Sequence, residues 1–188
     1  MGTNQLSRRG FFVAAGACGA GVVLSTTARG ASGEVRKVRL STPRAEKIGW
    51  RLSCGLYTFR DRSFYEALDV IAGLGIRCVE PAFFLPLSKE QPDLKTSESL
   101  APAQRREMKQ RLEDRGMLMA SYYAALEADT STFRKVFDFA KEMGVETLVA
   151  EPPAQVFEAL DGLCQEYKIN LAIHNHSEVA GSKYWRPE

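Results

Sequence analysis

The fold is decided by residues 144–176, which read GVETLVAEPPAQVFEALDGLCQEYKINLAIHNH. In this stretch a short apolar segment (146–150) precedes a helical pattern (155–167), and a second short apolar segment (170–173) follows it. Apolar strands that alternate with amphipathic helices are typical of βαβ units, whose two strands are parallel. We therefore predict one parallel βαβ unit over residues 144–176.

The same alternation occupies the chain before this stretch. Ser63, with Glu66 three residues later, has the capping-box pattern of a helix start. Glycines at the ends of the helical patterns, including Gly75, Gly116 and Gly144, predict where helices stop. On these grounds we predict strands at 51–59, 76–80 and 117–123 and helices at 63–74, 101–112 and 130–143.

Five βα units of similar length fit either a closed (β/α)8 barrel or an open doubly wound sheet. Neither GxGxxG nor GxxxxGK[ST] follows the first predicted strand, so the phosphate-binding turn of the open nucleotide-binding sheets is missing. This favours the barrel. A complete barrel takes about 250 residues and eight strands, whereas only about 140 residues follow position 47. We predict an α/β fold, a partial (β/α)8 TIM barrel of about five βα units over residues 48–188.

The N-terminus has the pattern of an export signal. Arg8 and Arg9 precede an apolar, Gly/Ala-rich run (13–24), and small residues follow it. The arginine pair resembles the twin-arginine signal family, which implies export of folded cargo. The run is shorter than the about 20 residues that span a membrane. We predict a signal peptide over 1–31, a linker over 32–47, no stable membrane span after signal removal, and a periplasmic or secreted protein. An ordinary secretory signal or a retained anchor is the alternative.

Composition places the chain among ordinary soluble domains. A hydrophobic fraction of 45% and a charged fraction of 26% exclude disordered and fibrous classes. The net charge of +2 gives no reason to expect nucleic acid as a partner. The four cysteines form no CxxC pair, so we predict reduced, buried thiols and no disulfide framework.

Polar side chains collect at the predicted carboxyl ends of the strands, where both parallel-sheet architectures form their sites. Glu80 and Glu151 end the second and fourth strands, and His174 and His176 follow the fifth. A carboxylate that ends an apolar strand is costly to desolvate unless a cation or metal pairs with it. Carboxylate and imidazole together suit divalent Mn, Zn, Fe or Co. We expect these four side chains to meet at a common mouth.

Each candidate also has a structural interpretation. The glutamates could pair with a nearby Arg or Lys, and the histidines could stabilise a loop through backbone hydrogen bonds. The aromatic residues at strand ends could belong to the core or its rim rather than to a sugar site; these are Tyr57, Tyr122, Tyr123 and Trp185.

Residues 48–188 resemble the sugar phosphate isomerase/epimerase family, the xylose isomerase-like barrels. The resemblance rests on the order and spacing of four pieces: Gly55 to Phe59, Gly73 to Ile76 followed by Val79-Glu80, Ala140 to Val145, and Leu171 to His176. The match covers about the first five of the family's eight βα units.

The resemblance implies metal-assisted isomerisation or epimerisation of a small carbohydrate, in which carboxylates shuttle a proton beside a carbonyl and the metal polarises the oxygens. In the family the fifth strand ends in Glu-Asn-His, and the glutamate binds the metal. His174 stands at that position here, and Asn175 and His176 match. The resemblance thus assigns His174 to a divalent metal (Mn, Co, Zn or Mg) and Glu151 and His176 to catalysis. It assigns substrate contacts to Tyr57, Glu80 and Trp185.

Two other functions stay open. Related barrels include metal-dependent hydrolases that cleave phosphodiesters, although two histidines and no basic groove argue against that activity here. The family's remaining metal ligands come from strands six to eight, which we expect to be absent. A truncated, non-catalytic barrel or a weak sugar-binding protein is therefore the alternative, and for it we expect no isomerase turnover with Mn²⁺ or Co²⁺. Exposed edges at the first and fifth strands would then favour self-association.

Overall fold

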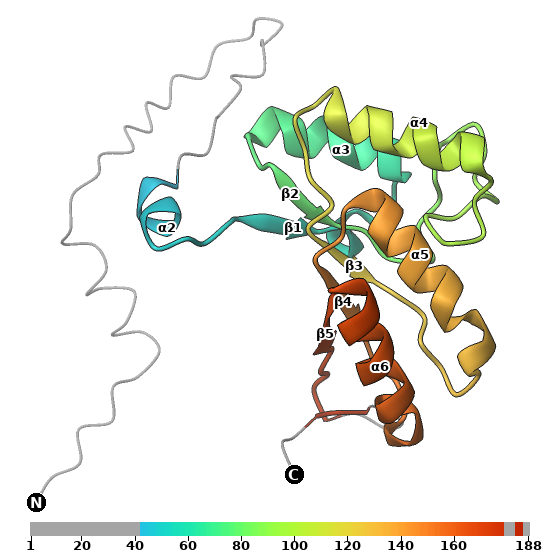
Figure 1. Ribbon diagram of the computed structural model, residues 1–188. Coiled ribbons are helices and arrows are strands. Elements are labelled where there is room, and N and C mark those ends of the chain that lie inside the picture. Colours follow the sequence, from blue (N-terminus) through green and yellow to red (C-terminus); the bar gives the residue numbers. More distant parts are fainter. Residues whose placement is uncertain (1–41, 179–182, 186–188) are drawn as a thin grey trace, which may run out of the picture. The chain divides into compact units, whose positions relative to one another are not determined.

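The computed structural model describes residues 42–178 and 183–185 (Figure 1). The predicted signal peptide and residues 32–41 of the predicted linker lie outside the described residues. At the described end of the linker, helix α2 (Pro43–Lys47) has no buried residue. Among the described residues, no helix has the length and apolarity that crossing a membrane requires.

In the described part of the chain, five short parallel strands lie side by side in the order of the sequence. They pair as β1 with β2, β3 with β4 and β4 with β5, and isolated parallel bridges join the β2 region to the β3 region. A doubly wound sheet would reverse this order at a switch point, whereas a (β/α)8 barrel keeps it. The partial barrel predicted from the sequence is therefore confirmed. The strands are β1 (Ser53–Gly55), β2 (Cys78–Glu80), β3 (Ser121–Tyr123), β4 (Thr147–Ala150) and β5 (Asn170–Ile173).

Four long helices follow one another along the same side of the strands (Figure 1). Side chains on that side of the strands, such as Val79, Tyr122 and Leu148, are fully buried and form the core with the helices. The alternate side chains, such as Glu80 and Tyr123, face the other way, as the two-residue period of a strand requires. The helices are α3 (Phe64–Leu74), α4 (Pro102–Glu113), α5 (Phe133–Met143) and α6 (Phe157–Tyr167).

Strand lengths differ from the sequence prediction more than helix ends do. The predicted strand 51–59 is paired only at β1, and the next four residues form the 3-10 helix η2 (Leu56–Phe59). This turn buries Leu56 completely and leaves Tyr57 61% exposed, which places an aromatic ring at the strand end. Short 3-10 turns also open the third and fourth predicted helices: η3 (Thr130–Thr132) and η4 (Ala154–Val156). The fifth strand has the predicted bounds.

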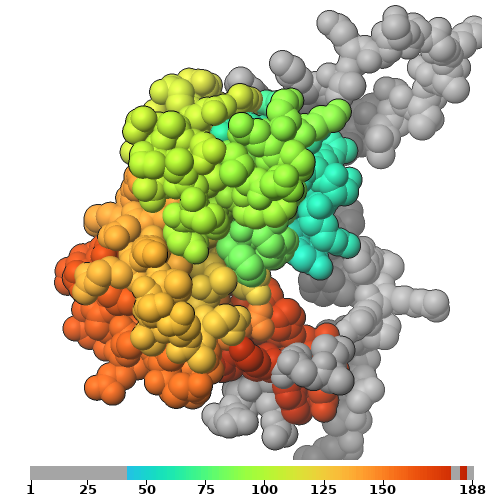
Figure 2. Space-filling view, turned by 90° about the vertical axis from the view of Figure 1, so that its right-hand side faces the viewer, coloured from blue at the N-terminus to red at the C-terminus, as the bar shows by residue number. Residues whose placement is uncertain are grey.

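Residues 81–101, between β2 and α4, form an ordered connection that the sequence patterns did not predict. The hydroxyl of Thr96 donates to the Ala82 carbonyl at 2.7 Å, and the buried Tyr122 hydroxyl donates to the Thr96 carbonyl at 2.9 Å. On the face shown in Figure 2, this connection forms one continuous surface with α4 and α5. It brings Phe83 and Phe84 to the carboxyl ends of the strands.

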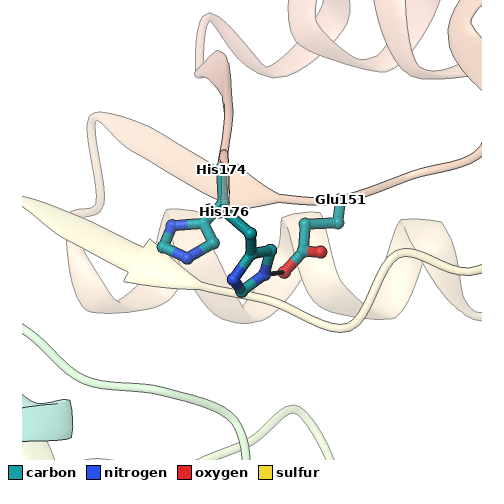
Figure 3. Close-up of side chains that lie close together, drawn as sticks. All are labelled: Glu151, His174 and His176. Atoms are coloured by element: carbon teal, nitrogen blue, oxygen red, sulfur yellow. Dashed lines mark hydrogen bonds and ion pairs between the residues drawn. The ribbon is translucent and has the colours of Figure 1, made fainter. Parts of the chain in front are cut away.

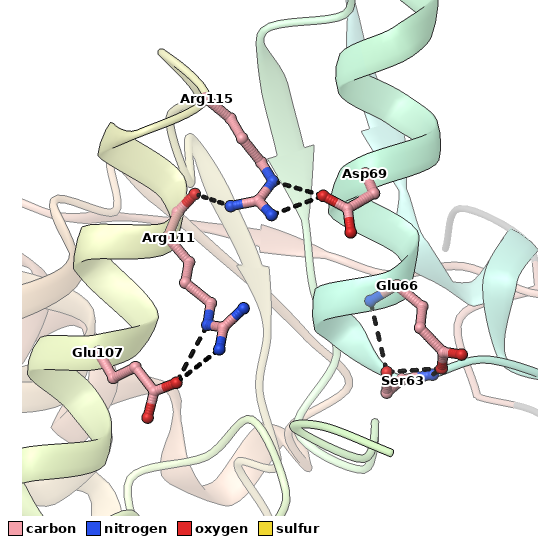
Figure 4. A network of polar contacts seen from close by, with 6 residues as sticks. All are labelled: Ser63, Glu66, Asp69, Glu107, Arg111 and Arg115. Atoms are coloured by element: carbon pink, nitrogen blue, oxygen red, sulfur yellow. Dashed lines mark hydrogen bonds and ion pairs between the residues drawn. The ribbon is translucent and has the colours of Figure 1, made fainter. Parts of the chain in front are cut away.

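Polar contacts join the first two long helices (Figure 4). Arg115, just after α4, donates to one carboxylate oxygen of Asp69 on α3 at 2.9 and 2.5 Å. The Arg111 guanidinium lies 4.1 Å from the centroid of the Tyr65 ring. Neighbouring helices are thus held together as in a barrel wall.

The described cysteines are free, as predicted, but only Cys78 is fully buried.

Gly144 ends α5 in the left-handed region, with φ of 77°, and no atom would contact a Cβ there. We expect Gly144→Ala to lower the free energy of unfolding by about 1 kcal/mol, because only backbone strain opposes the change. Gly162 lies exposed inside α6 and is equally uncrowded. Gly162→Ala should therefore raise the free energy of unfolding by about 0.5–1 kcal/mol. Urea denaturation measures both, and two changes of the same sign would contradict this account.

Ser63 caps α3 through a capping box with Glu66. The Ser63 N–H donates to Glu66 Oε2 at 3.0 Å, and the Glu66 N–H donates to Ser63 Oγ at 3.4 Å. Ser63→Ala should lower the free energy of unfolding by about 1 kcal/mol at neutral pH. The exposed Ser131→Ala, as a control, should change it by less than about 0.5 kcal/mol.

The effect of Ser63→Ala should also depend on pH. Hydrogen bonds from the Ser63 side chain and backbone lower the pKa of Glu66 from its ordinary value of 4.5. A lowered folded-state pKa contributes stability that is present above the unfolded pKa and is lost as pH falls through the folded value. The stability difference between wild type and Ser63→Ala should thus be smaller at about pH 3 than at about pH 7. Urea titrations at both pH values measure it, and an equal or larger difference at the lower pH would contradict the linkage.

Candidate functional site

Glu151, His174 and His176 meet at the carboxyl ends of β4 and β5 (Figure 3). Their candidate ligand atoms all lie within 4.8 Å of one another. The strand register explains the meeting: Ala150 pairs with Ile173, and the His174 N–H donates to the Ala150 carbonyl at 2.9 Å. Glu151 and His174 are the next residues of their strands, so the ladder sets them side by side.

Glu151 is the acceptor at the centre of this cluster. His176 Nε2 lies 2.9 Å from Glu151 Oε1, and the Tyr123 hydroxyl donates to the same oxygen. The His174 and His176 rings lie edge to face, with centroids 4.7 Å apart. Lys183 Nζ donates to the Glu151 backbone carbonyl at 3.3 Å. The Glu151 carboxylate, at the end of β4, is thus hydrogen-bonded to side chains from β3 and from the segment after β5.

The electrostatics favour an ionised Glu151. Partial burial raises the pKa of Glu151, but hydrogen bonds from Tyr123 and His176 and the charges of both histidines outweigh it, so this pKa lies below its ordinary value. Burial, and then the bond to Glu151, raise the pKa of Tyr123 well above that of a free phenol. Tyr123 therefore remains a protonated donor, and Glu151 remains a carboxylate, across the physiological pH range.

A cavity of about 390 Å³ opens beside the cluster. This volume falls within the range of small-molecule sites. The half-buried Glu80 enters it from β2 and accepts a hydrogen bond from Ser121 Oγ at 2.6 Å. Tyr57 and Phe84 form an aromatic wall, with rings edge to face and centroids 6.2 Å apart. The lining residues are Gly55, Leu56, Tyr57, Glu80, Ala82, Phe84, Tyr123, His174 and His176.

A larger groove of about 660 Å³ lies at the other edge of β5, against α6. It contains neither histidine nor Glu80, and its walls include Phe157, Leu171 and Ile173. We place the candidate site in the smaller cavity because polar groups of complementary chemistry converge there.

The structure brings together most of the residues singled out in the sequence. Tyr57, Glu80, His174 and His176 line one cavity, and Glu151 contacts His176. The sequence resemblance assigned a single metal position, His174, whereas candidate ligand atoms of Glu151 and His176 also lie within 4.8 Å of it. Trp185, 37% exposed, is not among the lining residues, so its contact with substrate stays a prediction.

Sequence reasoning did not assign Ser121 or Tyr123 to the site. Both lie on β3, two residues apart, and their hydroxyls bind Glu80 and Glu151. Strand alternation places them on one face. Which face they share, and which neighbours they meet, depends on long-range register that local patterns do not contain.

Comparison with protein-family models gives no match, and comparison with curated proteins gives no significant match. Among solved structures, an uncharacterized protein from Parabacteroides distasonis is similar over 68% of this chain, with 24% identity and a TM-score of 0.60. This chain covers 53% of that protein. The likeness shows that this chain shares its fold with part of that protein.

Two further solved structures are matched more loosely. A xylose isomerase domain containing protein from Salmonella typhimurium LT2 has 15% identity and a TM-score of 0.48 over 65% of this chain and 48% of its own. A D-psicose 3-epimerase, solved with D-fructose, has 12% identity and a TM-score of 0.48 over 66% of this chain and 52% of its own. With these TM-scores below 0.5, we base no argument on them. The chain spans about half the length of the solved structures that it matches.

Proposed function

We propose that this chain provides a divalent-metal and proton-transfer site for the isomerisation or epimerisation of a small carbohydrate. The observation that carries the proposal is the cluster of Glu151, His174 and His176 beside a cavity of about 390 Å³. A carboxylate oxygen together with an imidazole nitrogen suits Mn²⁺, Co²⁺ or Zn²⁺ better than Mg²⁺, which prefers oxygen ligands alone.

Metal binding and proton transfer would fall to different residues of the site. Glu151 and His174 would hold the ion, which when bound would supply Lewis acidity toward the carbonyl and hydroxyl oxygens of the sugar. His176, which is hydrogen-bonded to Glu151 Oε1 and would not bind the ion, can take up and return a proton beside the carbonyl. This proton transfer requires the carbon next to the carbonyl to lie within reach of the His176 ring.

The remaining walls suit a polyhydroxylated molecule. Glu80, on the β2 side of the cavity, offers a carboxylate that can accept hydrogen bonds from sugar hydroxyls. The rings of Tyr57 and Phe84 offer an apolar surface for the C–H face of a sugar ring. In an otherwise aromatic cavity, a small number of well-placed polar groups fixes the orientation of a small ligand.

Binding without turnover is the second candidate. Among the described residues, β5 has a strand neighbour on one side only, so the cavity is not closed by a sixth strand. An open cavity leaves water near the reacting carbon and weakens every electrostatic contribution to catalysis.

The first test is a metal titration. Purified protein titrated with Mn²⁺ or Zn²⁺ in a calorimeter should bind about one ion per chain. Glu151→Gln and His174→Ala should each weaken binding by more than the roughly 10–100-fold typical of losing an outer partner of a metal ligand. Glu158→Gln, an exposed substitution on α6, is the matched control and should leave the affinity unchanged. Equal affinities in all four proteins would refute the metal site.

The second test is exchange of a carbon-bound hydrogen. With Mn²⁺ and a panel of free ketohexoses and aldohexoses in D₂O, we expect deuterium to enter the position beside the carbonyl, as measured by NMR. His176→Ala should slow the exchange by about 10²–10⁴-fold because it removes the proton-transfer group, whereas Glu158→Gln should not. Metal binding without any exchange would favour the second candidate over the first.

A further inference from the structure

Strand β3 places a hydroxyl against each of the two carboxylates of the site. Ser121 Oγ donates to Glu80 Oε2 at 2.6 Å, and the Tyr123 hydroxyl donates to Glu151 Oε1. Glu80 ends β2, and Glu151 follows β4, so the two acceptors flank β3 on either side. Because residues 121 and 123 share one face of the strand, a single strand reaches both carboxylates.

We propose that Tyr123 is a positioning residue that fixes the orientation of the Glu151 carboxylate for metal binding. The inference rests on the proposed function, because it assigns Glu151 to the ion. Both contacts from described residues to this carboxylate, those of Tyr123 and His176, go to Oε1. The hydrogen bonds from described residues do not involve the second oxygen, Oε2, and this is the oxygen that we assign to the ion.

Tyr123 is itself held on several sides, as a positioning residue must be. Its N–H donates to the Pro81 carbonyl at 2.9 Å, and its carbonyl accepts from the Phe83 N–H at 3.0 Å. Its ring lies against those of Phe83, Phe84 and His174, with centroid distances of 6.0, 6.5 and 5.1 Å. These contacts hold the Tyr123 hydroxyl in place, so the Glu151 carboxylate adopts the orientation that brings Oε1 to it.

The neighbouring tyrosine provides a contrast within the same strand. Tyr122 points to the helix side, is fully buried, and donates its hydroxyl to the Thr96 carbonyl at 2.9 Å. Its hydroxyl satisfies a backbone group of the connection 81–101 and touches no candidate ligand. Removing either hydroxyl is the same chemical change, but the two have different partners.

The experiment compares Tyr123→Phe with Tyr122→Phe in the full chain, with Mn²⁺ as the probe. Tyr123→Phe should weaken Mn²⁺ binding by about 10–100-fold, the usual effect of losing an outer partner of a ligand. Its thermal midpoint should change little, because the ring and its contacts remain. Tyr122→Phe should lower the thermal midpoint and leave Mn²⁺ affinity as in wild type. The visible spectrum of bound Co²⁺ should shift in Tyr123→Phe alone, because only there does the ligand field change.

Wild-type affinity and an unchanged Co²⁺ spectrum in Tyr123→Phe would overturn the inference. Should the wild-type chain bind no Mn²⁺ at all, the proposed function fails, and crystal structures of wild type and Tyr123→Phe then decide the positioning role. A Glu151 carboxylate that turns away from His176 in Tyr123→Phe supports that role. One that keeps its rotamer and its contact with His176 refutes it.

Discussion

The parallel register between β4 and β5 is the constraint on which the site depends. Pairing of Ala150 with Ile173 sets Glu151 beside His174 at the ends of the two strands. A slip of one residue would turn every side chain of β5 to the opposite face of the sheet. Leu171 would then leave the core, against which it packs. The packing of Leu171 against the core thus favours the same register that assembles the polar cluster.

Stability and site chemistry occupy opposite faces of the same strands. Toward the helices, Tyr122 and Leu148 are fully buried. Arg51 and Glu146, which precede β1 and β4, form a bidentate ion pair although they lie 95 positions apart in sequence. Both side chains of this pair are about half exposed, so it contributes only about 0–1 kcal/mol. The curved arrangement of strands is therefore held mainly by packing against the helices, and polar residues on the inner face are free to serve another purpose.

Local sequence patterns predicted the features that local physics determines. Ser63 with Glu66 marks the start of α3, and Gly144 adopts the left-handed conformation that ends α5. The missing glycine-rich turn correctly favoured a barrel over an open sheet. Strand lengths and the roles of Ser121 and Tyr123 were not predictable in this way, because the hydrogen-bond partners of these two residues lie 41 and 28 residues away along the chain. The resemblance supplied His174 as a metal position, but only the register shows that Glu151 and His176 are within reach of the same point.

Folding alone does not account for the arrangement around Glu151. Burying most of a carboxylate, whose side chain is 19% exposed, opposes ionisation, and the chain offsets that cost with a tyrosine hydroxyl and an imidazole. His176 is 41% exposed, so its contribution to packing is small. If the residue at position 176 served only stability, we would expect an apolar side chain, or a Lys or Arg that forms an ion pair with the Glu151 carboxylate. Instead, the chain places two imidazoles beside one carboxylate that accepts hydrogen bonds from Tyr123 and His176, at a cavity with aromatic walls. That combination is costly for a core and suited to a cation, which is the physical reason to look for function at this end of the strands.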